Sequence, residues 1–154
     1  QYKKSISLAK TSQAALKELY ANNNRHWADS LINCQNLLAT NYANIGELES
    51  AINIFKSCLD ITIKYEKENR EWTMKHVQTL GNLAYCYEQI DSIEESISTH
   101  KLLLVTIEDL YKKNQLQWKD SYISRISDLA QTYRRNYYIA EALDLESIQN
   151  SILS

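Results

Sequence analysis

Apolar residues recur along this chain at helical spacing, and one arrangement of them appears three times. The stretch from Trp72 to Ile97 matches Trp27 to Ile52 at a shift of 45 residues and Trp118 to Leu143 at a shift of 46. A fixed period of this length is typical of repeat proteins, in which each unit buries its apolar face against its neighbours. The pattern therefore predicts an array of repeats.

The copies agree at the positions that packing requires. Each begins with a tryptophan, and a tyrosine stands seven residues before it. We expect each tryptophan to pack on tyrosine at a turn between repeats, in preference to forming an exposed binding stripe. The aligned sets are Tyr20, Tyr65 and Tyr111; Trp27, Trp72 and Trp118; Leu38, Leu83 and Leu129; Ala39, Ala84 and Ala130; and Tyr42, Tyr87 and Tyr133.

The spacing predicts seven helices and no strand. The first, residues 3–21, is expected to be the second helix of a repeat that lacks its first helix. Its predicted inner stripe consists of Ile6, Ala9, Leu16, Leu19 and Tyr20. The other helices are expected at about residues 25–43, 48–66, 72–88, 93–112, 118–135 and 138–153.

Local signals mark several of these helix ends. Asn24 and Asn69 each stand three residues before a tryptophan and are predicted N-caps. Ser92 with Glu95 has the spacing of a capping box. Gly46 is expected to supply the positive φ of a turn that reverses the chain.

Length and composition support an all-helical domain. The 154 residues contain no proline and only two glycines, against averages of about 5% and 7%. A sandwich, a barrel or a disordered linker is hard to build from such a composition. We expect one array over residues 1–154, with a truncated repeat at 1–24 and repeats at 25–69, 70–115 and 116–154.

Charge and terminal sequence limit the expected partners and location. The net charge of −2 argues against a nucleic-acid or membrane partner, which would select a basic surface. The chain begins at Gln1 without a signal peptide and has no apolar run of about 18 residues. It is expected to be a soluble piece of a larger protein inside the cell, in the cytoplasm or the nucleus.

The three cysteines are predicted to be reduced. Cys34, Cys58 and Cys86 are an odd number without C-x-x-C spacing, and they fall beside core positions of the repeats. Buried thiols are therefore expected, in a reducing compartment.

The first helices carry Leu38-Ala39-x-x-Tyr42, Leu83-Ala84-x-x-Tyr87 and Leu129-Ala130-x-x-Tyr133, and the second helix of repeat one carries Ala51-x-x-x-Phe55. At these residues the chain resembles the tetratricopeptide repeat family. The longer period, the missing proline and the earlier tryptophan depart from its common pattern. The longer units are similar to the extended repeats of kinesin light chains and of bacterial peptide-sensing regulators. The resemblance implies a right-handed α-solenoid of antiparallel helix-turn-helix units.

No pattern in the sequence indicates catalysis, a cofactor or a metal. His26, His76 and His100 are not spaced as zinc-binding pairs and have no cluster of ligands around them. A nucleophile elbow, a phosphate-binding loop and a zinc-protease motif are all absent from the sequence. We therefore expect a protein that is not an enzyme.

The polar face of each predicted first helix is the candidate site. In tetratricopeptide arrays this face lines a concave groove, so the resemblance implies contacts with a protein or peptide segment. The candidate residues are Asn33, Asn36, Thr40 and Asn44; Gln78, Gly81, Asn82, Tyr85 and Gln89; and Ser124, Ser127, Asp128, Gln131 and Arg135.

Amides can hold a peptide without reading its sequence, because each has donors and an acceptor for backbone groups. Asn36 and Asn82 are the foremost candidates, since their register resembles that of peptide-holding asparagines in light-chain-like repeats. The alternative is that the chain is simply rich in asparagine. Gly81 should destabilise its helix by about 1 kcal/mol relative to alanine, which predicts the close approach of a neighbouring helix or of a ligand backbone.

Two functions remain open at this stage. One is an adaptor that holds a segment of another protein, and the other is a regulatory domain that controls an effector domain of the same polypeptide. The family's carboxylate clamp is not expected, because neutral residues occupy its positions. Arg134 and Arg135 could instead hold an acidic segment at the third repeat.

Overall fold

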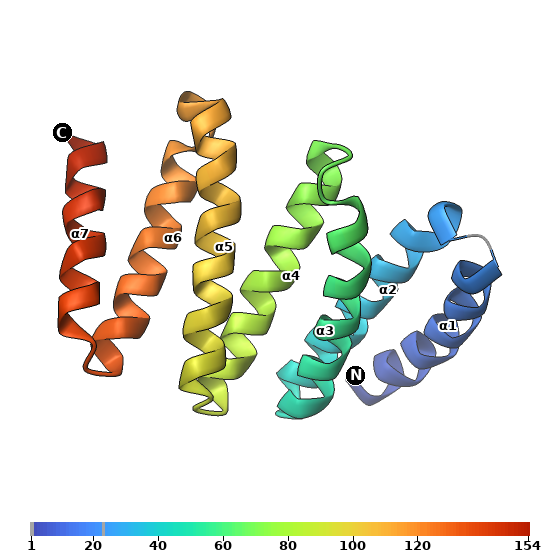
Figure 1. Cartoon of the computed structure of the whole chain (residues 1–154). Coiled ribbons are helices and arrows are strands. Elements are labelled where there is room, and N and C mark those ends of the chain that lie inside the picture. The colour runs from blue at the N-terminus through green and yellow to red at the C-terminus, as the bar shows by residue number, and fades with distance from the viewer. Residues whose placement is uncertain (1, 23) are drawn as a thin grey trace. The chain divides into compact units, whose positions relative to one another are not determined.

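The structure is a computed structural model that describes residues 2–22 and 24–154. The side chain of Asn24, and with it the first predicted N-cap, lies outside the described residues. The described residues form seven α-helices and no strand, which confirms the all-α prediction (Figure 1). They are α1 (Tyr2–Asn22), α2 (Asn24–Asn44), α3 (Leu48–Tyr65), α4 (Arg70–Gln89), α5 (Ile93–Lys113), α6 (Gln115–Arg135) and α7 (Ile139–Leu153).

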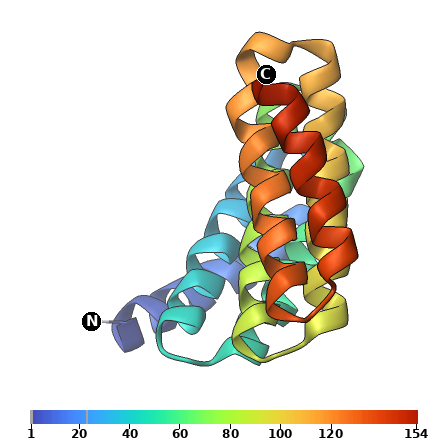
Figure 2. The same cartoon turned by 90° about the vertical axis from the view of Figure 1, so that its left-hand side faces the viewer.

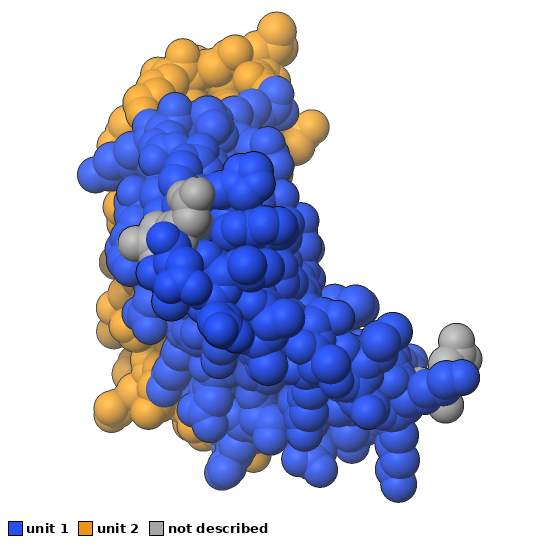
Figure 3. Space-filling view, turned by 90° about the vertical axis from the view of Figure 1, so that its right-hand side faces the viewer, with its two compact units in different colours: residues 1–90 blue, residues 91–154 orange. Residues whose placement is uncertain are grey.

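The chain divides into two compact units, residues 1–90 and residues 91–154, coloured blue and orange in Figure 3. In the first unit α1 packs on α2, α2 on α3, and α3 on α4. In the second, α6 packs against both α5 and α7 (Figures 1 and 2). Consecutive helices within each unit run antiparallel and are joined by short turns.

A left-handed residue reverses the chain at the same place in every repeat. Gly46 has φ 81°, Asp91 has φ 55° and Tyr137 has φ 65°, and the three positions are related by the repeat shifts of 45 and 46. Only the glycine adopts this conformation without steric strain. The repeat geometry therefore imposes the turn even where the sequence shows no glycine.

The other two predicted N-caps, Asn69 and Ser92, differ in whether the side chain makes a capping hydrogen bond. Asn69 has an extended backbone, and its Oδ1 accepts a hydrogen bond from the Trp72 N–H at 3.1 Å, as predicted. Ser92 is the N-cap of α5, but its hydroxyl makes no capping hydrogen bond, so the predicted capping box with Glu95 is wrong. With ψ near 78°, Ser92 departs from the extended conformation in which a cap side chain usually points at the first turn.

The core follows most of the predicted stripes, but Leu143, aligned with the buried Ile52 and Ile97, is exposed, as are Ile93 and Ile139. Leu31, Leu38, Phe55 and Leu80 are almost completely buried, because their helical spacing turns them toward neighbouring helices. Leu19 of α1 is instead exposed, since only one side of α1 packs on the rest of its unit.

Trp72 confirms the predicted packing of tryptophan on tyrosine. It is 3% exposed, its ring centroid lies 4.9 Å from that of Tyr65, and the Arg25 guanidinium covers both rings. Trp27 is only half-buried and meets the His26 ring edge-on. Tyr111 stacks on Tyr122 at 4.9 Å, so the aromatic partners change from repeat to repeat.

Candidate functional site

Two neighbouring helices of the first unit present most of the predicted contacts. We call their outer surface the α2–α4 face. On α2 it consists of Ser30, Asn33, Leu37, Thr40 and Asn44, and on α4 of Met74, Gln78, Asn82, Tyr85 and Gln89. All of these are exposed except Asn82, which is half-buried. Steps of three or four residues place them along one side of each helix.

Lys75 ties α2 to α4 at one edge of this face. Its ammonium lies 3.0 Å from Asp29 Oδ1 and 3.4 Å from Glu71 Oε1, and it donates to Asn33 Oδ1 at 3.2 Å. The Asn33 amide nitrogen in turn donates to Asp29 at 3.2 Å. Both ends of the Asn33 amide are therefore engaged within the protein, and Asn33 supports the face rather than offering a free amide.

The other amides of the α2–α4 face have no such partners. Within the described residues, the side chains of Asn44, Gln78, Asn82 and Gln89 make no hydrogen bond. The carbonyl oxygen of Asn36 is shielded from solvent and has no donor. A buried acceptor without a partner is destabilising by about 1–3 kcal/mol, and such a group calls for an explanation.

Gly81 leaves an open strip of helix backbone between Gln78 and Tyr85. A Cβ built on this glycine would meet no atom within 4 Å. The close approach of a neighbouring helix, which was one of the two predicted reasons for the glycine, is therefore absent. Contact with a ligand backbone stays a prediction.

The α2–α4 face is also almost free of charge. Residues 30–44 of α2 contain no aspartate, glutamate, lysine, arginine or histidine, and residues 76–87 of α4 contain of these only the buried His76, although 23% of the whole chain is charged. Exposed helix positions usually favour lysine and glutamate, which have better helix propensity than asparagine. A neutral surface of this extent therefore differs from an ordinary solvated helix face.

Sequence reasoning missed the apolar members of the face. Leu37 is 55% exposed and Met74 is 39% exposed, while the predicted Tyr85 is 54% exposed. Leu37 aligns with Asn82 and Asp128, so the repeat alignment itself places it among the groove positions. The amides thus alternate with large apolar side chains.

The predicted contacts on α6 are mostly engaged by their own unit. Asp128 pairs with Arg125 at 3.0 Å, and Ser127 accepts a hydrogen bond from Gln149 at 2.9 Å. Arg134 donates from Nε and Nη2 to the two oxygens of Glu146, each at 2.6 Å. Arg134, a predicted anchor for an acidic segment, therefore already holds a carboxylate of α7.

These α6 and α7 side chains surround an open hollow of about 330 Å³. Gln131 lies on its rim without a hydrogen bond, whereas Arg135 does not line it. Its lining residues are Ser127, Asp128, Ala130, Gln131, Arg134, Glu146 and Gln149.

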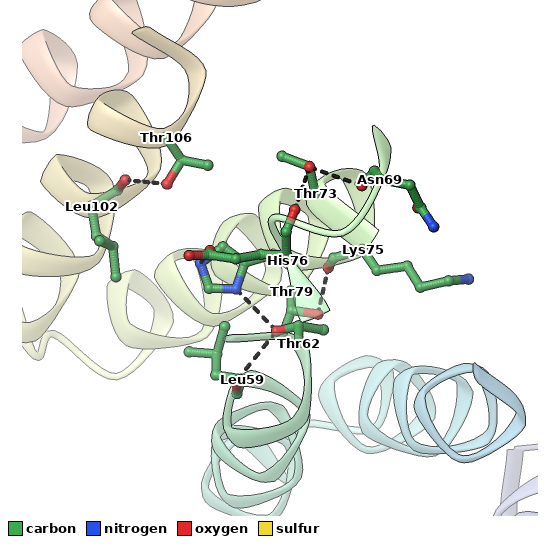
Figure 4. A network of polar contacts seen from close by, with 10 residues as sticks. Leu59, Thr62, Asn69, Thr73, Lys75, His76, Thr79, Leu102 and Thr106 are labelled. Atoms are coloured by element: carbon green, nitrogen blue, oxygen red, sulfur yellow. Dashed lines mark hydrogen bonds and ion pairs between the residues drawn. The ribbon is translucent and has the colours of Figure 1, made fainter. Parts of the chain in front are cut away.

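A polar network at His76 was not predicted. Its Nδ1 lies 3.0 Å from Thr62 Oγ1 (Figure 4), and its Nε2 lies 3.2 Å from Glu66 Oε2. Burial lowers the pKa of His76, and the Glu66 carboxylate opposes that shift in part. The order hydroxyl, imidazole, carboxylate is that of a nucleophilic site, but Thr62 and His76 are both buried. The network therefore links α3 to α4 and offers no route for a substrate.

The thiols follow the predicted burial in two of three cases. Cys58 and Cys86 are buried and free. Burial raises the pKa of Cys58 to about 12 and also raises the pKa of Cys86. Cys34 is half-buried, which corrects the prediction at that position, and its thiol donates to the Ala9 carbonyl at 3.4 Å. All three thiols are therefore poorly reactive.

Neither a metal-binding cluster nor a membrane-spanning helix is found among the described residues. Among the described residues, no three or more histidines, cysteines and carboxylates gather where they could hold a metal ion. None of the helices formed by these residues is long and apolar enough to cross a membrane.

Comparison with known proteins identifies the architecture. No protein-family model matches the sequence, and no curated protein is similar enough to count as a relative. The crystal structure of BtubC (BKLC) from P. vanneervenii is similar, with a TM-score of 0.68, 14% identity and 99% coverage of this chain. This chain spans 57% of the length of that protein.

A second similar structure comes from Podosopora anserina and is described as a kinesin light chain with nearly identical TPR-like repeats. It has a TM-score of 0.68 and 18% identity, and the match covers 97% of this chain and 74% of that one. The helical repeats within each unit, the recurring turn and these two likenesses agree with one another. This chain therefore has the tetratricopeptide-like repeat fold of helical solenoid proteins.

Proposed function

We propose that this protein is an interaction module that holds a segment of a partner protein on the α2–α4 face. The observation that carries the proposal is the set of unpaired amides on an exposed, uncharged surface. Proteins with tetratricopeptide-like repeats generally serve as interaction scaffolds, and the proposal includes no catalytic step. Within it, residues 25–69, 70–115 and 116–154 are the repeats.

Asn82 is proposed as the main clamp for the partner backbone. Its amide can donate to a peptide carbonyl and accept from a peptide N–H, and no group of the described residues competes for it. Gln78 lies one turn before it, and Gly81 leaves room for a main chain beside it. Asn33 has the supporting role, because Lys75 and Asp29 already hold it.

The experiment compares the wild-type chain with Asn82→Ala against a partner obtained by affinity capture. We expect binding to weaken by about 1–3 kcal/mol, since the partner keeps a desolvated polar group without its hydrogen bond. Binding should change little between low and high salt, because the contacts are neutral.

Asn53→Ala is the matched control, since Asn53 is exposed on α3 and outside the face. Melting curves of all three proteins show whether folding is preserved. Unchanged affinity of a folded Asn82→Ala protein would remove the α2–α4 face as the binding site.

A further inference from the structure

We infer that the segment bound on the α2–α4 face is itself uncharged and covers Leu37 and Tyr85 with apolar side chains. This inference rests on the proposed function and adds the chemistry of the partner. It follows from three properties of the face: which charges are missing, which charges are already paired, and where apolar side chains are exposed.

Over most of its length the face has no group that could compensate a charged ligand, and Glu88, near the end of α4, has an interaction within the chain. No ionised side chain occurs in residues 30–44 of α2 or 76–87 of α4, and burial lowers the pKa of His76, which keeps that ring neutral. Desolvating a lysine or glutamate of the partner against this surface would leave its charge unpaired, which is strongly unfavourable. The α2–α4 face therefore disfavours the binding of acidic and basic segments alike.

The charges at the edge of the face are already committed to one another. The Lys75 ammonium has Asp29, Glu71 and Asn33 around it and is largely buried. An ammonium has three donors, so these three acceptors leave it none for a partner. An acidic segment consequently gains no counter-charge from Lys75.

Exposed apolar side chains on the face supply the binding free energy that neutral amides do not. Leu37 and Tyr85 each leave more than half of their surface in water, and Met74 adds to the apolar area on α4. Covering such groups is the general source of binding free energy, whereas polar contacts mainly set orientation. Leu37 stands on α2 and Tyr85 on α4, so a ligand that covers both contacts both helices.

The size of the face sets the length of a suitable probe. Residues 30–44 of α2 span roughly 21 Å at about 1.5 Å per residue. An extended peptide covers that length with about six or seven residues at roughly 3.3 Å each. Peptides of about eight residues, acetylated and amidated to remove the terminal charges, are therefore adequate.

The test uses three fluorescent peptide sets with the full chain. All have leucine, phenylalanine or tyrosine at two central positions, flanked by serine, threonine, asparagine and glutamine. In the second set two flanking residues are glutamate, and in the third they are lysine. Anisotropy gives the affinity, and amide chemical shifts show which helices respond.

We expect the uncharged set to bind with shifts on α2 and α4, and either charge to weaken binding by about tenfold or more, as for an unpaired buried charge. Replacing both central residues by serine should abolish binding. Leu37→Ser and Tyr85→Ser should each weaken it by about tenfold. Ile63→Ser, an equally exposed position on α3, should leave it unchanged.

Different results would contradict the inference about the segment's chemistry and the proposed function. Charged peptides that bind the α2–α4 face as tightly as uncharged ones would overturn this inference and leave the proposed function standing. The same holds if Leu37→Ser and Tyr85→Ser both bind normally. If no set shifts the resonances of α2 and α4, the proposed function falls with it.

Discussion

The first helices α2 and α6 hold the same place in their repeats but expose opposite kinds of surface. Residues 30–44 of α2 are uncharged, whereas α6 includes two aspartates, a lysine and three arginines. Leu37 on α2 aligns with Asp128 on α6, and Ala43 aligns with Arg134. Apart from Asn33, the amides of the α2–α4 face are unpaired among the described residues, while Arg125, Asp128 and Arg134 of α6 are engaged within their own unit.

The second helices α3 and α7 explain part of this difference. Phe55 of α3 is fully buried against Leu83 and Tyr87 of α4. The aligned residue of α7 is Glu146, which faces the open hollow and binds Arg134. The same repeat position is therefore occupied by an apolar residue, Phe55, where α4 covers it and by a charged residue, Glu146, where it faces the open hollow. Shared fold positions do not imply shared surface chemistry.

The largest effect should come from cutting back Phe55. We expect Phe55→Ala to destabilise the protein by about 3–5 kcal/mol, because it leaves a cavity between α3 and α4. Glu146→Ala should barely change the melting temperature, since exposed ion pairs contribute little. Urea unfolding of both variants measures the contrast. Equal losses would show that the two positions are energetically alike.

A smaller effect is expected from the link between α2 and α4. Lys75→Met keeps the side-chain volume but removes three charge-assisted contacts, and we expect a loss of about 1.5–3 kcal/mol. Lys112→Met is the control, because the ion pair of Lys112 with Glu108 lies within one helix. Amide chemical shifts of Asn33 should also change in the Lys75 variant. A stable variant with unchanged Asn33 shifts would contradict the role given to Lys75.

The His76 network predicts a dependence of stability on pH. The folded pKa of His76 lies below its ordinary value of 6.5, so the unfolded chain binds more protons between the two pKa values. The free energy of unfolding should therefore fall as the pH drops through 6.5. Below the folded pKa of His76, this residue should cause no further loss. Urea unfolding from pH 7.5 to 5 measures the slope.

Two variants separate His76 from the other histidines. His76→Gln should flatten the slope in this pH range, whereas His26→Gln, at an exposed position, should leave it unchanged. A slope that survives in His76→Gln would assign the pH dependence to other groups.

The smallest expected change is at Gly81. Gly81→Ala should stabilise the protein by up to about 1 kcal/mol, because alanine is the better helix former and its Cβ meets no neighbour. The same substitution should weaken binding of the uncharged peptides if their backbone passes over this strip. Thermal melting and anisotropy on one preparation give both results. Stronger or equal binding would place the ligand elsewhere on the face.

Much of the fold could be predicted because its signals are local. The seven helices follow from apolar spacing and end within about three residues of their predicted bounds. Asn69 and Gly46 were recognisable because a cap and a left-handed turn each depend on one residue type. Ser92 makes no capping hydrogen bond, and its backbone angles are close to those of Glu47 and Tyr138, which also follow a left-handed residue and make none.

The candidate site was predictable only as a set of helix positions. Spacing placed the amides on the outer side of α2 and α4, and it equally placed Leu37 there. Leu37 was not predicted as a contact because the candidates were chosen mainly for their polar side chains, although Leu37 aligns with Asn82. The sequence could not show that Arg134 is occupied, because its partner Glu146 lies on another helix.

By itself, the sequence determined the repeat, the helices and the neutral character of residues 30–44 and 76–87, because these depend on composition and on spacing along one chain segment. Tertiary structure alone decided which amides are free. Asn33 and Asn82 look alike in sequence, but Lys75, 42 residues beyond Asn33, holds its oxygen, and no described group holds Asn82. The physical reason is that a hydrogen bond needs its partner within about 3 Å, and only the packing of α4 beside α2 brings a donor to the side-chain oxygen of Asn33.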